Sequence, residues 1–497
     1  MEKTQDNPEK NKMGFKNLLM NGGLEKKQKK KNSRILSFDS IDVFEDNFSI
    51  SDTRPGTPCK LSYFPISIIL ILIIIIVLLP VFNHRLAFNP DLLGPIAPPP
   101  CSDTCDISLV ESIPENLVYN SSVLRKSTYS AWKELLNISE SRIELAGMYW
   151  TLRGKDIQYE DESAWQGEDI FKNIKSAVKE KGLELWIAQN QPNPEEPNLD
   201  TEDLEQTVGA RVRSLNFTRL VGAGILHTKL WLVDRKHFYV GSANFDWRSL
   251  TQVKEVGVLV KNCPCLAEDM GKIWDVYWAL GAPGASVPKS WPDSLSTQIN
   301  LDTPVSVLNS HLSVSISSSP PPFCPQGRDS DIEAILRTID SAKEFVRVAV
   351  MDYYPATLYR SHTQFWPVID NALRKAAIER KVKVELLLSD WDHTIPSMLY
   401  YLRSLQALNG VAPGVHIRVR MFRVPSFTPA QKKVPFGRVN HNKYLVTEST
   451  GFVGTSNWSA DYFISTGGIG FVFAGALRND LEELFQRDWN SSYASDL

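Results

Sequence analysis

Two short segments of the sequence carry the same reactive side chains at nearly the same spacing. The first, HTKLWLVDRKHFYVGSAN, begins with His227 and Lys229 and ends at Asn244. Its apolar residues are typical of a buried strand, on which side chains two residues apart point to the same face. His227 and Lys229 can therefore meet one anion. The ammonium group would hold an oxygen of that anion, and the imidazole would act as nucleophile or transfer a proton.

The second segment, HNKYLVTESTGFVGTSN, repeats this order of residues with His441, Lys443 and Asn457. The histidine and the asparagine are 17 positions apart in the first segment and 16 in the second, which indicates a shorter turn in the second copy. The repeat makes a chance match of either segment less credible, because lysines, asparagines and histidines in the same order twice can serve the same chemistry on an anion.

The sequence around each segment is duplicated as well. Residues 143–150 and 346–353 read as apolar strands, and each is followed by a helical pattern and a further apolar strand. Each half therefore has the order strand, helix, strand and His-x-Lys strand, which predicts two similar α/β domains. The paired helices are expected at residues 169–182 and 367–381, and the paired second strands at 183–188 and 382–388.

These features resemble the phospholipase D superfamily, whose signature is His-x-Lys-x4-Asp, present twice per active site. His227, Lys229 and Asp234 match the first copy in full, whereas the second copy has Glu448 where the signature has aspartate. The glutamate at this position and the segments GSANFDWRSLTQVKE and GTSNWS resemble the sequences of the animal membrane-anchored lysosomal branch. The members of that branch are 5′ exonucleases on single-stranded nucleic acid. The resemblance extends roughly from Cys101 to the end of the chain.

The resemblance implies an α/β fold of two duplicated α-β-α domains packed about a pseudo-twofold axis. We expect the first phospholipase D-like domain at residues 83–315 and the second at 316–497. Proline-rich stretches near residues 98 and 318 read as linkers, the second of which separates the two domains.

In the mechanism that the resemblance implies, one histidine attacks phosphorus to form a phosphohistidine, and the other protonates the leaving oxygen and then activates water. The superfamily's orienting carboxylate follows the histidine by 28 residues, which places it at Glu255 in the first half and at Gly468 in the second. We therefore expect Glu255 to orient His227, which favours His227 as the nucleophile and His441 as the general acid. The side chains expected to bind the non-bridging oxygens are Lys229, Lys443, Asn244 and Asn457.

Four further residues are assigned to the site. The hydroxyls of Ser242 and Thr455, each two residues before an asparagine, are expected to donate hydrogen bonds to the substrate. Asp234 and Glu448 belong to the signature and are counted with the catalytic set, although we expect them to brace their lysines and turns rather than touch substrate. The histidines and acidic residues lack the close spacing of a zinc site, so neither a metal nor another cofactor is expected.

The first part of the chain predicts a membrane anchor. Residues 1–60 are polar, with a basic run and acidic patches, and read as a disordered tail. Residues 61–82 form an uncharged apolar stretch long enough to cross a membrane as one helix. More basic residues precede this stretch than follow it closely, so we expect a cytosolic N-terminus and a type II single-pass orientation.

The residues beyond that stretch have the composition of a lumenal region. Five of the six cysteines lie there, and so do four Asn-x-Ser/Thr glycosylation acceptors, Asn120, Asn137, Asn216 and Asn490. Two cysteines near residue 101 and two near residue 263 can form two bridges. The resemblance implies passage through the endoplasmic reticulum and Golgi to the endosomal and lysosomal lumen, where a soluble form can be released. It also implies the nested pairs Cys101 with Cys265 and Cys105 with Cys263.

The charge of the chain excludes a general nucleic-acid-binding surface. The whole chain has a net charge of −3, and residues 61–497 hold 42 basic and 48 acidic side chains. A nucleic-acid substrate must therefore be held by a local groove, in an acidic compartment that protonates histidines and some carboxylates.

Three functions are compatible with these residues. The first is a lysosomal exonuclease that trims single-stranded DNA or RNA to nucleoside 3′-monophosphates and so limits nucleic-acid sensing in innate immunity. The second is a phospholipase D or transphosphatidylase of lysosomal lipid metabolism, which a long apolar funnel near the motifs would favour, whereas an aromatic stacking platform would favour the nuclease. The third is an inactive binding glycoprotein, which the presence of both histidines and both lysines disfavours. The resemblance leaves open whether the chain forms a homodimer.

Overall fold

The structure, a computed structural model, describes residues 101, 104–157, 159, 161–193, 197–360 and 362–497 of the 497-residue chain. The expected cytosolic tail, residues 1–60, and the expected transmembrane helix, residues 61–82, lie outside the described residues. Within the described part, none of the helices combines the length and the apolar character that crossing a membrane requires.

The first half of the described chain folds around an eight-stranded mixed sheet with the order β2-β1-β10-β8-β7-β3-β5-β6. Strands β3, β5 and β6 run parallel, and β7 pairs antiparallel with β3, so the His-x-Lys segment enters the sheet beside the first parallel strand. The strands are β1 (Asp106–Ser112), β2 (Lys126–Ser127), β3 (Arg142–Gly147), β5 (Glu184–Asn190), β6 (Arg211–Leu215), β7 (Lys229–Val233), β8 (His237–Gly241) and β10 (Glu255–Lys261).

The second half repeats this topology in a nine-stranded sheet with the order β11-β12-β20-β18-β17-β13-β15-β16-β21. The run from β12 to β16 corresponds strand for strand to the run from β1 to β6 of the first sheet, which confirms the predicted duplication. The strands are β11 (Val305–Val307), β12 (Leu312–Ser319), β13 (Phe345–Val350), β15 (Lys383–Asp390), β16 (Ile417–Arg423), β17 (Lys443–Thr447), β18 (Thr450–Gly454), β20 (Gly468–Ala474) and β21 (Ala494–Asp496).

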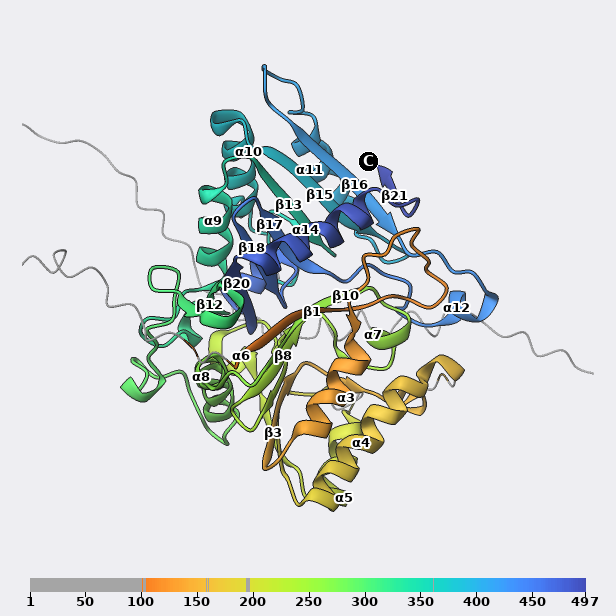
Figure 1. Ribbon diagram of the computed structural model, residues 1–497, viewed down its shortest axis with the longest axis vertical. Coiled ribbons are helices and arrows are strands. Elements are labelled where there is room, and N and C mark those ends of the chain that lie inside the picture. The colour runs from red at the N-terminus through yellow and green to blue at the C-terminus, as the bar shows by residue number, and fades with distance from the viewer. Residues whose placement is uncertain (1–100, 102–103, 158, 160, 194–196, 361) are drawn as a thin grey trace, which may run out of the picture. The chain divides into compact units, whose positions relative to one another are not determined.

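Helices cover both sheets (Figure 1). Helices α3, α4 and α5 share a core with one face of the first sheet, and α9, α10 and α11 share a core with one face of the second. The longer helices are α3 (Thr128–Ile138), α4 (Trp165–Lys181), α5 (Leu199–Val208), α8 (Pro264–Leu280), α9 (Asp331–Ser341), α10 (Val368–Arg380), α11 (Pro396–Gln406) and α14 (Ala476–Trp489). The short ones are α6 (Phe217–Val221), α7 (Arg248–Thr251), α12 (Pro429–Lys433) and α13 (Ala460–Ile464).

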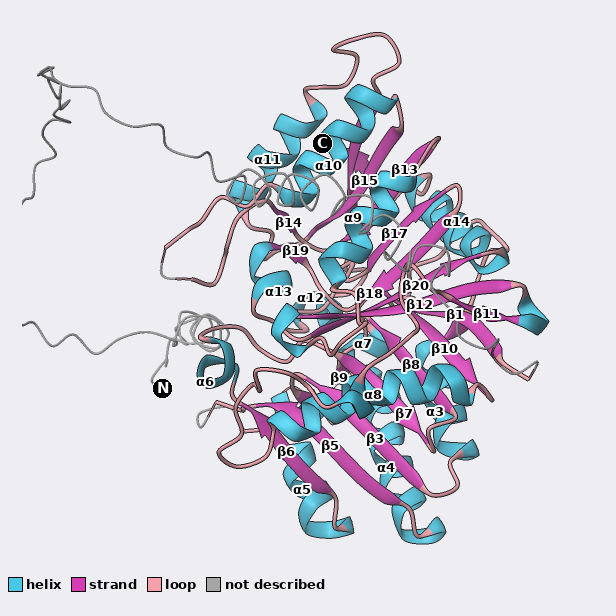
Figure 2. Cartoon of the chain, turned by 90° about the vertical axis from the view of Figure 1, so that its left-hand side faces the viewer, coloured by secondary structure: helices cyan, strands magenta, loops and turns pink. Residues whose placement is uncertain are grey.

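The inner faces of the two sheets belong to one hydrophobic core, in which α8 and α14 also take part. Side chains alternate between the faces of a strand, so Leu230 and Leu232 of β7 point into this shared core, while Trp231 and Val233 point toward α3. Figure 2 shows the strands of both sheets with helices between and around them. The two halves are therefore packed against each other through apolar side chains rather than joined by a tether.

The serine- and proline-rich stretch near residue 318 is not the predicted linker. Residues Ser313–Ser319 pair with Gly468–Ala474 of β20 in the second sheet. Ser317 Oγ donates to Asp331 Oδ1 at 2.7 Å, so small polar side chains are accommodated there by a partner at the start of α9. The domain division expected between residues 315 and 316 therefore falls inside β12, and the chain crosses between the sheets in residues 281–304.

Two disulfides attach the start of the described chain to the N-terminal end of α8. Cys101 is bonded to Cys265, and Cys105 is bonded to Cys263. This nested pairing confirms the one that the resemblance implied.

The expected glycosylation acceptors lie on the surface to different degrees. Asn120, Asn137 and Asn490 are exposed. Asn216 is half-buried and caps α6, because its side-chain oxygen accepts from Arg219 N at 2.9 Å. Glycosylation at the four positions stays a prediction.

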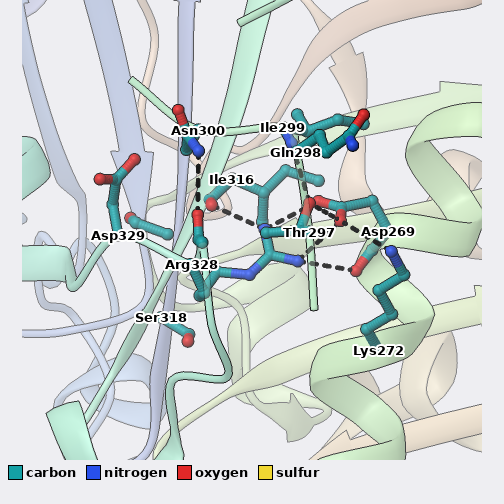
Figure 3. A network of polar contacts seen from close by, with 12 residues as sticks. Asp269, Lys272, Thr297, Gln298, Ile299, Asn300, Ile316, Ser318, Arg328 and Asp329 are labelled. Atoms are coloured by element: carbon teal, nitrogen blue, oxygen red, sulfur yellow. Dashed lines mark hydrogen bonds and ion pairs between the residues drawn. The ribbon is translucent and has the colours of Figure 1, made fainter. Parts of the chain in front are cut away.

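A buried ion pair connects the two halves (Figure 3). Arg328 donates to both carboxylate oxygens of Asp269 on α8, at 2.7 and 2.8 Å, and to Ile316 O of β12 at 2.8 Å. Thr297 Oγ1 also donates to Asp269, at 2.5 Å. The Arg328 guanidinium therefore joins α8 to the second sheet, and the Asp269 carboxylate also holds the connecting segment.

We expect Arg328→Met to lower the free energy of unfolding by about 3–5 kcal/mol, because it removes the guanidinium that bonds both oxygens of the buried Asp269 carboxylate. Thermal unfolding of the purified protein measures this effect. The exposed pair of Lys236 with Glu140 offers a control, and Lys236→Ala should leave the melting temperature nearly unchanged. Equal melting temperatures for wild type and Arg328→Met would contradict the role given to this pair.

Candidate active site

Reciprocal backbone contacts join the two halves beside both histidines. His227 N donates to Gly467 O at 2.9 Å, and His441 N donates to Lys254 O at 2.8 Å. Parallel β-bridges between the halves accompany both contacts. Gly467 and Lys254 directly precede β20 and β10, so each histidine is fixed to the start of a strand of the opposite half, as a pseudo-twofold arrangement requires.

His227 has a backbone carbonyl as the partner of its ring. Its Nδ1 lies 2.8 Å from Thr455 O, and the edge-to-face contact with Tyr462 has a centroid distance of 5.0 Å. A carbonyl oxygen only accepts hydrogen bonds, so Nδ1 must carry the hydrogen and the neutral ring keeps its lone pair on Nε2. This is the tautomer that a nucleophilic imidazole needs.

His441 has a carboxylate as its partner instead. Its Nδ1 lies 2.9 and 3.0 Å from the two carboxylate oxygens of Glu255, whose side chain is fully buried. The expectation that Glu255 orients His227 is therefore wrong. The reason is the crossing of the two halves: the strand that begins with Glu255 contacts the histidine segment of the second half, not that of its own half.

The corresponding position beside His227 has no room for a carboxylate. A Cβ added at Gly468 would lie 2.4 Å from Ser456 Oγ and 2.7 Å from Ser319 Oγ. The two histidines are thus equivalent in backbone position and different in electrostatic surroundings.

Both lysines of the motifs are buried next to their histidines. Lys229 Nζ donates to His227 O at 2.5 Å, and Lys443 Nζ donates to His441 O at 2.7 Å. Burial lowers the pKa of Lys229 well below its usual range, and the charge of Lys443 lowers it further. Burial lowers the pKa of Lys443 to about 7, against the opposing charges of Glu255 and Asp352. A bound anion would stabilise both ammonium groups.

The histidines share this positive environment. Burial, followed by the charges of Lys229 and Lys443, lowers the pKa of His227 well below 6.5, and His441 adds to the effect. Burial and the same two lysines lower the pKa of His441, against the hydrogen bond to the Ser242 backbone. The side chains of both motifs therefore form one electrostatically coupled site.

Each motif asparagine is held by a side chain from the loop after the first parallel strand. Asn244 Nδ2 donates to the Tyr149 hydroxyl at 3.1 Å. Asn457 Nδ2 donates to Asp352 Oδ2 at 3.1 Å and to the Tyr462 hydroxyl at 3.2 Å. The amide oxygens of both asparagines are buried and accept no hydrogen bond from the described residues.

Tyr149, Asp352 and Tyr462 were not anticipated from the sequence. Tyr149 and Asp352 stand at equivalent positions, two residues after β3 and β13, so aligning the two halves would have paired them. Two small parallel sheets hold these loops beside the asparagines. They are β4 (Trp150–Thr151) with β9 (Phe245–Asp246), and β14 (Tyr353–Tyr354) with β19 (Trp458–Ser459).

The hydroxyls of Ser242 and Thr455 bond to the neighbouring strands. Ser242 Oγ donates to Val256 O at 3.1 Å, and Thr455 Oγ1 accepts from Ile469 N at 3.0 Å. Both side chains are fully buried. Their observed contacts hold β10 and β20 in place, and direct hydrogen bonds to substrate stay a prediction.

Asp234 and Glu448 lie away from the site, at the opposite ends of β7 and β17 from the lysines. Asp234 accepts from the backbone amides of residues 140–142 at 2.7–2.8 Å, and Glu448 accepts from those of residues 343–345 at 2.9–3.4 Å. Burial raises the pKa of each carboxyl, but these donors outweigh it and lower the pKa. The expected bracing of turns is confirmed, whereas bracing of the lysines and membership of the catalytic set are wrong.

An aromatic cluster lies on the loops around His441. The His393 and Phe436 rings are stacked with centroids 4.6 Å apart, and Trp391 meets His393 edge-to-face at 4.7 Å. The loop of Trp391 follows β15, which is parallel to β13, so both loops leave the sheet at the edge where Asp352 lies. We call Trp391, His393 and Phe436 the rim cluster.

Within the part of the chain that the structure describes, the grouping of possible metal ligands is the set of four cysteines, whose sulfur atoms lie within 4.8 Å of one another. These four sulfurs form the two disulfides, so they offer no thiolate ligands. The site itself presents two imidazoles, two ammonium groups and amides, a set suited to a phosphate anion.

Comparison with known proteins agrees with this geometry. Residues 120–427 match the family described as "PLD3/4, PLD-like domain". The chain is 46% identical over 414 residues to the "5'-3' exonuclease PLD3" of Pongo abelii, covering 82% of this chain and 84% of the relative. It is 41% identical over 409 residues to the "5'-3' exonuclease PLD4" of Mus musculus, covering 80% of each.

Among solved structures, the chain is similar to the crystal structure of a phosphatidylserine synthase from Haemophilus influenzae Rd KW20. The TM-score is 0.54 at 13% identity, covering 82% of this chain and 90% of that one, which shows the fold alone. The family match and the sequence identities identify the chain more closely: it belongs to the PLD3/4 branch of the phospholipase D superfamily.

Proposed function

We propose that this chain is a 5′-to-3′ exonuclease of single-stranded DNA and RNA that releases nucleoside 3′-monophosphates. The observation that carries the proposal is the coupled pair of His–Lys–Asn sets, one from each half, in a chain 41–46% identical to proteins named 5′-3′ exonucleases. The duplicated histidines supply a nucleophile and a proton donor, and the lysines supply the charge that a phosphodiester transition state requires.

In the first step, His227 Nε2 attacks phosphorus and a nitrogen–phosphorus bond forms. The bond from phosphorus to the 5′ oxygen of the next nucleotide breaks, and that oxygen takes the electron pair and a proton from His441. The first nucleoside stays on His227 through its 3′-phosphoryl group. Lys229 and Lys443 hold the non-bridging oxygens.

The division of roles rests on the different partners of the two rings. The carbonyl partner of His227 fixes a free lone pair on Nε2. At His441, burial raises the pKa of the Glu255 partner to about 8. Adding one proton to the Glu255–His441 pair places a hydrogen on Nε2 of His441, whichever of the two groups holds the bridging proton. His441 is therefore the ring that is prepared to donate a proton under acidic conditions.

In the second step, water attacks the phosphohistidine while His441, now deprotonated, accepts a proton from that water. The nitrogen–phosphorus bond breaks and the nucleoside 3′-monophosphate leaves. The site returns to its starting protonation state, and the shortened strand carries a free 5′-hydroxyl for the next round.

The rim cluster supports nucleic acid over lipid as the substrate. The rim cluster lies on loops at the edge of the second sheet where Asp352 lies, and aromatic faces at that edge can stack single-stranded bases without sequence preference. The chain's overall negative charge agrees with a substrate held locally rather than along an extended basic surface.

The proposed location follows from the sequence. Residues 61–82 would anchor the chain as a type II membrane protein, with residues 83–497 in the endosomal and lysosomal lumen. An acidic lumen matches a site whose histidine pKa values are lowered by burial and by two lysines.

We expect His227→Ala and His441→Ala each to reduce hydrolysis of a labelled single-stranded oligonucleotide at least 1,000-fold, on the order expected for loss of a nucleophile or an acid. Initial rates at about pH 5 measure the effect, and matched melting temperatures show that folding is intact. The exposed His416→Ala, directly before the start of β16 and remote from the site, is a control that should keep the wild-type rate. A variant of either motif histidine that keeps more than a few per cent of activity would refute the assignment.

The Glu255–His441 pair predicts a change in pH dependence. Glu255→Gln removes the carboxylate that stabilises the protonated pair, so the loss of kcat/KM with rising pH should move about 1 unit lower. Glu448→Gln, which alters a remote carboxylate, should leave the position of this limb unchanged. Rate profiles between pH 4 and 8 decide the point, and an unshifted limb in Glu255→Gln would rule out the proposed proton donor.

Direction of attack predicts the products. Digestion in strong chelator should give nucleoside 3′-monophosphates one at a time from the 5′ end. No metal is needed because the lysines balance the charge of the phosphate and the asparagine amides donate hydrogen bonds to it. Mass spectrometry of the digest identifies the phosphate position, with phosphatidylglycerol as a parallel lipid substrate. Nucleoside 5′-monophosphates, long internal fragments, or activity that needs added magnesium or zinc would each contradict the mechanism.

A further inference from the structure

A buried carboxyl that the two-histidine mechanism does not use lies beside the second motif. Asp352 is 7% exposed, and its Oδ2 accepts from Asn457 Nδ2 at 3.1 Å. Its backbone oxygen accepts from Trp458 N at 2.9 Å, which fixes the loop to β19. The side chain therefore has a defined position next to a residue expected to bind substrate.

Three titratable groups from other elements face Asp352. Lys443 of β17 is its cationic neighbour. Tyr462 of α13 and Tyr359 of the loop after β14 are its neutral neighbours, and burial raises the pKa of both hydroxyls. The charge of Asp352 is therefore balanced by Lys443, the same ammonium group that the mechanism needs for the substrate.

The amide of Asn457 has a fixed direction in this arrangement. Nδ2 donates to Asp352 and to the Tyr462 hydroxyl, while the buried Oδ1 accepts nothing from the described residues. An ionised carboxylate can only accept, so it holds the amide nitrogen away from a substrate. A neutral carboxyl can donate to the amide oxygen, which lets the amide turn and present its nitrogen to a phosphate.

The first half has a different group at this position. Tyr149 holds Asn244 there, and burial raises the pKa of the Tyr149 hydroxyl well above 10, so it stays neutral in the acidic and neutral range. Among the described hydrogen bonds of the two motif asparagine side chains, the one to an ionisable carboxyl is therefore in the second half.

We propose that Asp352 is a positioning residue that confines the reaction to acidic conditions. When ionised, Asp352 offsets the positive charge of Lys443, holds the Asn457 amide nitrogen and adds a negative charge to the site. When neutral, it leaves the charge of Lys443 and the amide nitrogen available to the phosphodiester. This inference rests on the proposed phosphodiesterase function and adds a second acid requirement to that of His441.

The titration of Asp352 falls in the relevant range. Burial raises the pKa of its carboxyl to about 6, against the charge of Lys443. About one tenth of the carboxyl would be neutral one pH unit above that value, and about nine tenths one unit below it. At about pH 5 the residue would therefore be mostly neutral, and at pH 7 mostly ionised.

The test compares Asp352→Asn with Tyr149→Phe. An asparagine at 352 has the same shape, stays uncharged and can donate to the Asn457 oxygen at any pH. We expect kcat/KM for a single-stranded oligonucleotide at pH 7 to rise about tenfold, with a change of less than about threefold at pH 5. Tyr149→Phe removes the hydroxyl that holds Asn244 and changes no charge, so it should lower kcat/KM at pH 5 and at pH 7 by the same factor.

A binding measurement separates positioning from chemistry. In the His227→Ala background, a phosphorothioate oligonucleotide is a stable anion at both pH values. Asp352→Asn should tighten its binding about tenfold at pH 7 and little at pH 5. An unchanged ratio between the two pH values, in rate or in affinity, would overturn the proposal.

Failure of the proposed function would be recognised separately. If the wild-type protein cleaves bis(p-nitrophenyl) phosphate but no oligonucleotide, the substrate assignment is wrong, and the Asp352 proposal is judged by the same pH ratio on that ester. A protein that cleaves neither would refute the phosphodiesterase and the Asp352 proposal with it.

Discussion

The site depends on two backbone contacts that cross between the halves. His227 is bonded to the residue before β20, and His441 is bonded to the residue before β10. Each histidine therefore takes its position from a strand of the other half, and a shared apolar core holds both sheets against these contacts. Neither half could form the site alone, because its histidine would lack the partner of its Nδ1.

This crossing also gives two similar halves different chemistry. The duplicated backbone places both imidazoles alike, yet the Glu255 carboxylate bonds to His441. At the equivalent position beside His227, Gly468 has no room for a side chain. In the proposed mechanism, the carbonyl partner prepares His227 to attack, and the carboxyl partner prepares His441 to donate a proton. Tyr149 and Asp352 repeat the same principle around the asparagines, with a neutral group in one half and an ionisable group in the other.

The sequence allowed the duplicated strands, helices and motifs to be predicted because each depends on local periodicity and fixed spacing. It predicted the wrong histidine for Glu255, because spacing along one chain does not show which half a strand end will meet. Residues Ser317–Ser319 lack the apolar pattern of a strand, so the sequence predicts a linker there. In the structure they form the end of β12, because the buried Asp331 carboxyl accepts a hydrogen bond from the Ser317 hydroxyl. Asp352 and Tyr149 were missed because their role comes from contacts with a distant asparagine, which only the folded chain brings near.

We propose that one composite site divides the work of catalysis between its histidines, with His227 attacking phosphorus and His441 transferring protons. A nucleoside 3′-(p-nitrophenyl phosphate) has a leaving group that needs no acid, so the His441→Ala variant should release one nitrophenolate per protein and then stop. Peptide mass spectrometry after a rapid alkaline quench should then find the nucleoside phosphoryl group on His227. Continued turnover without a burst, or the adduct on another residue, would contradict the account.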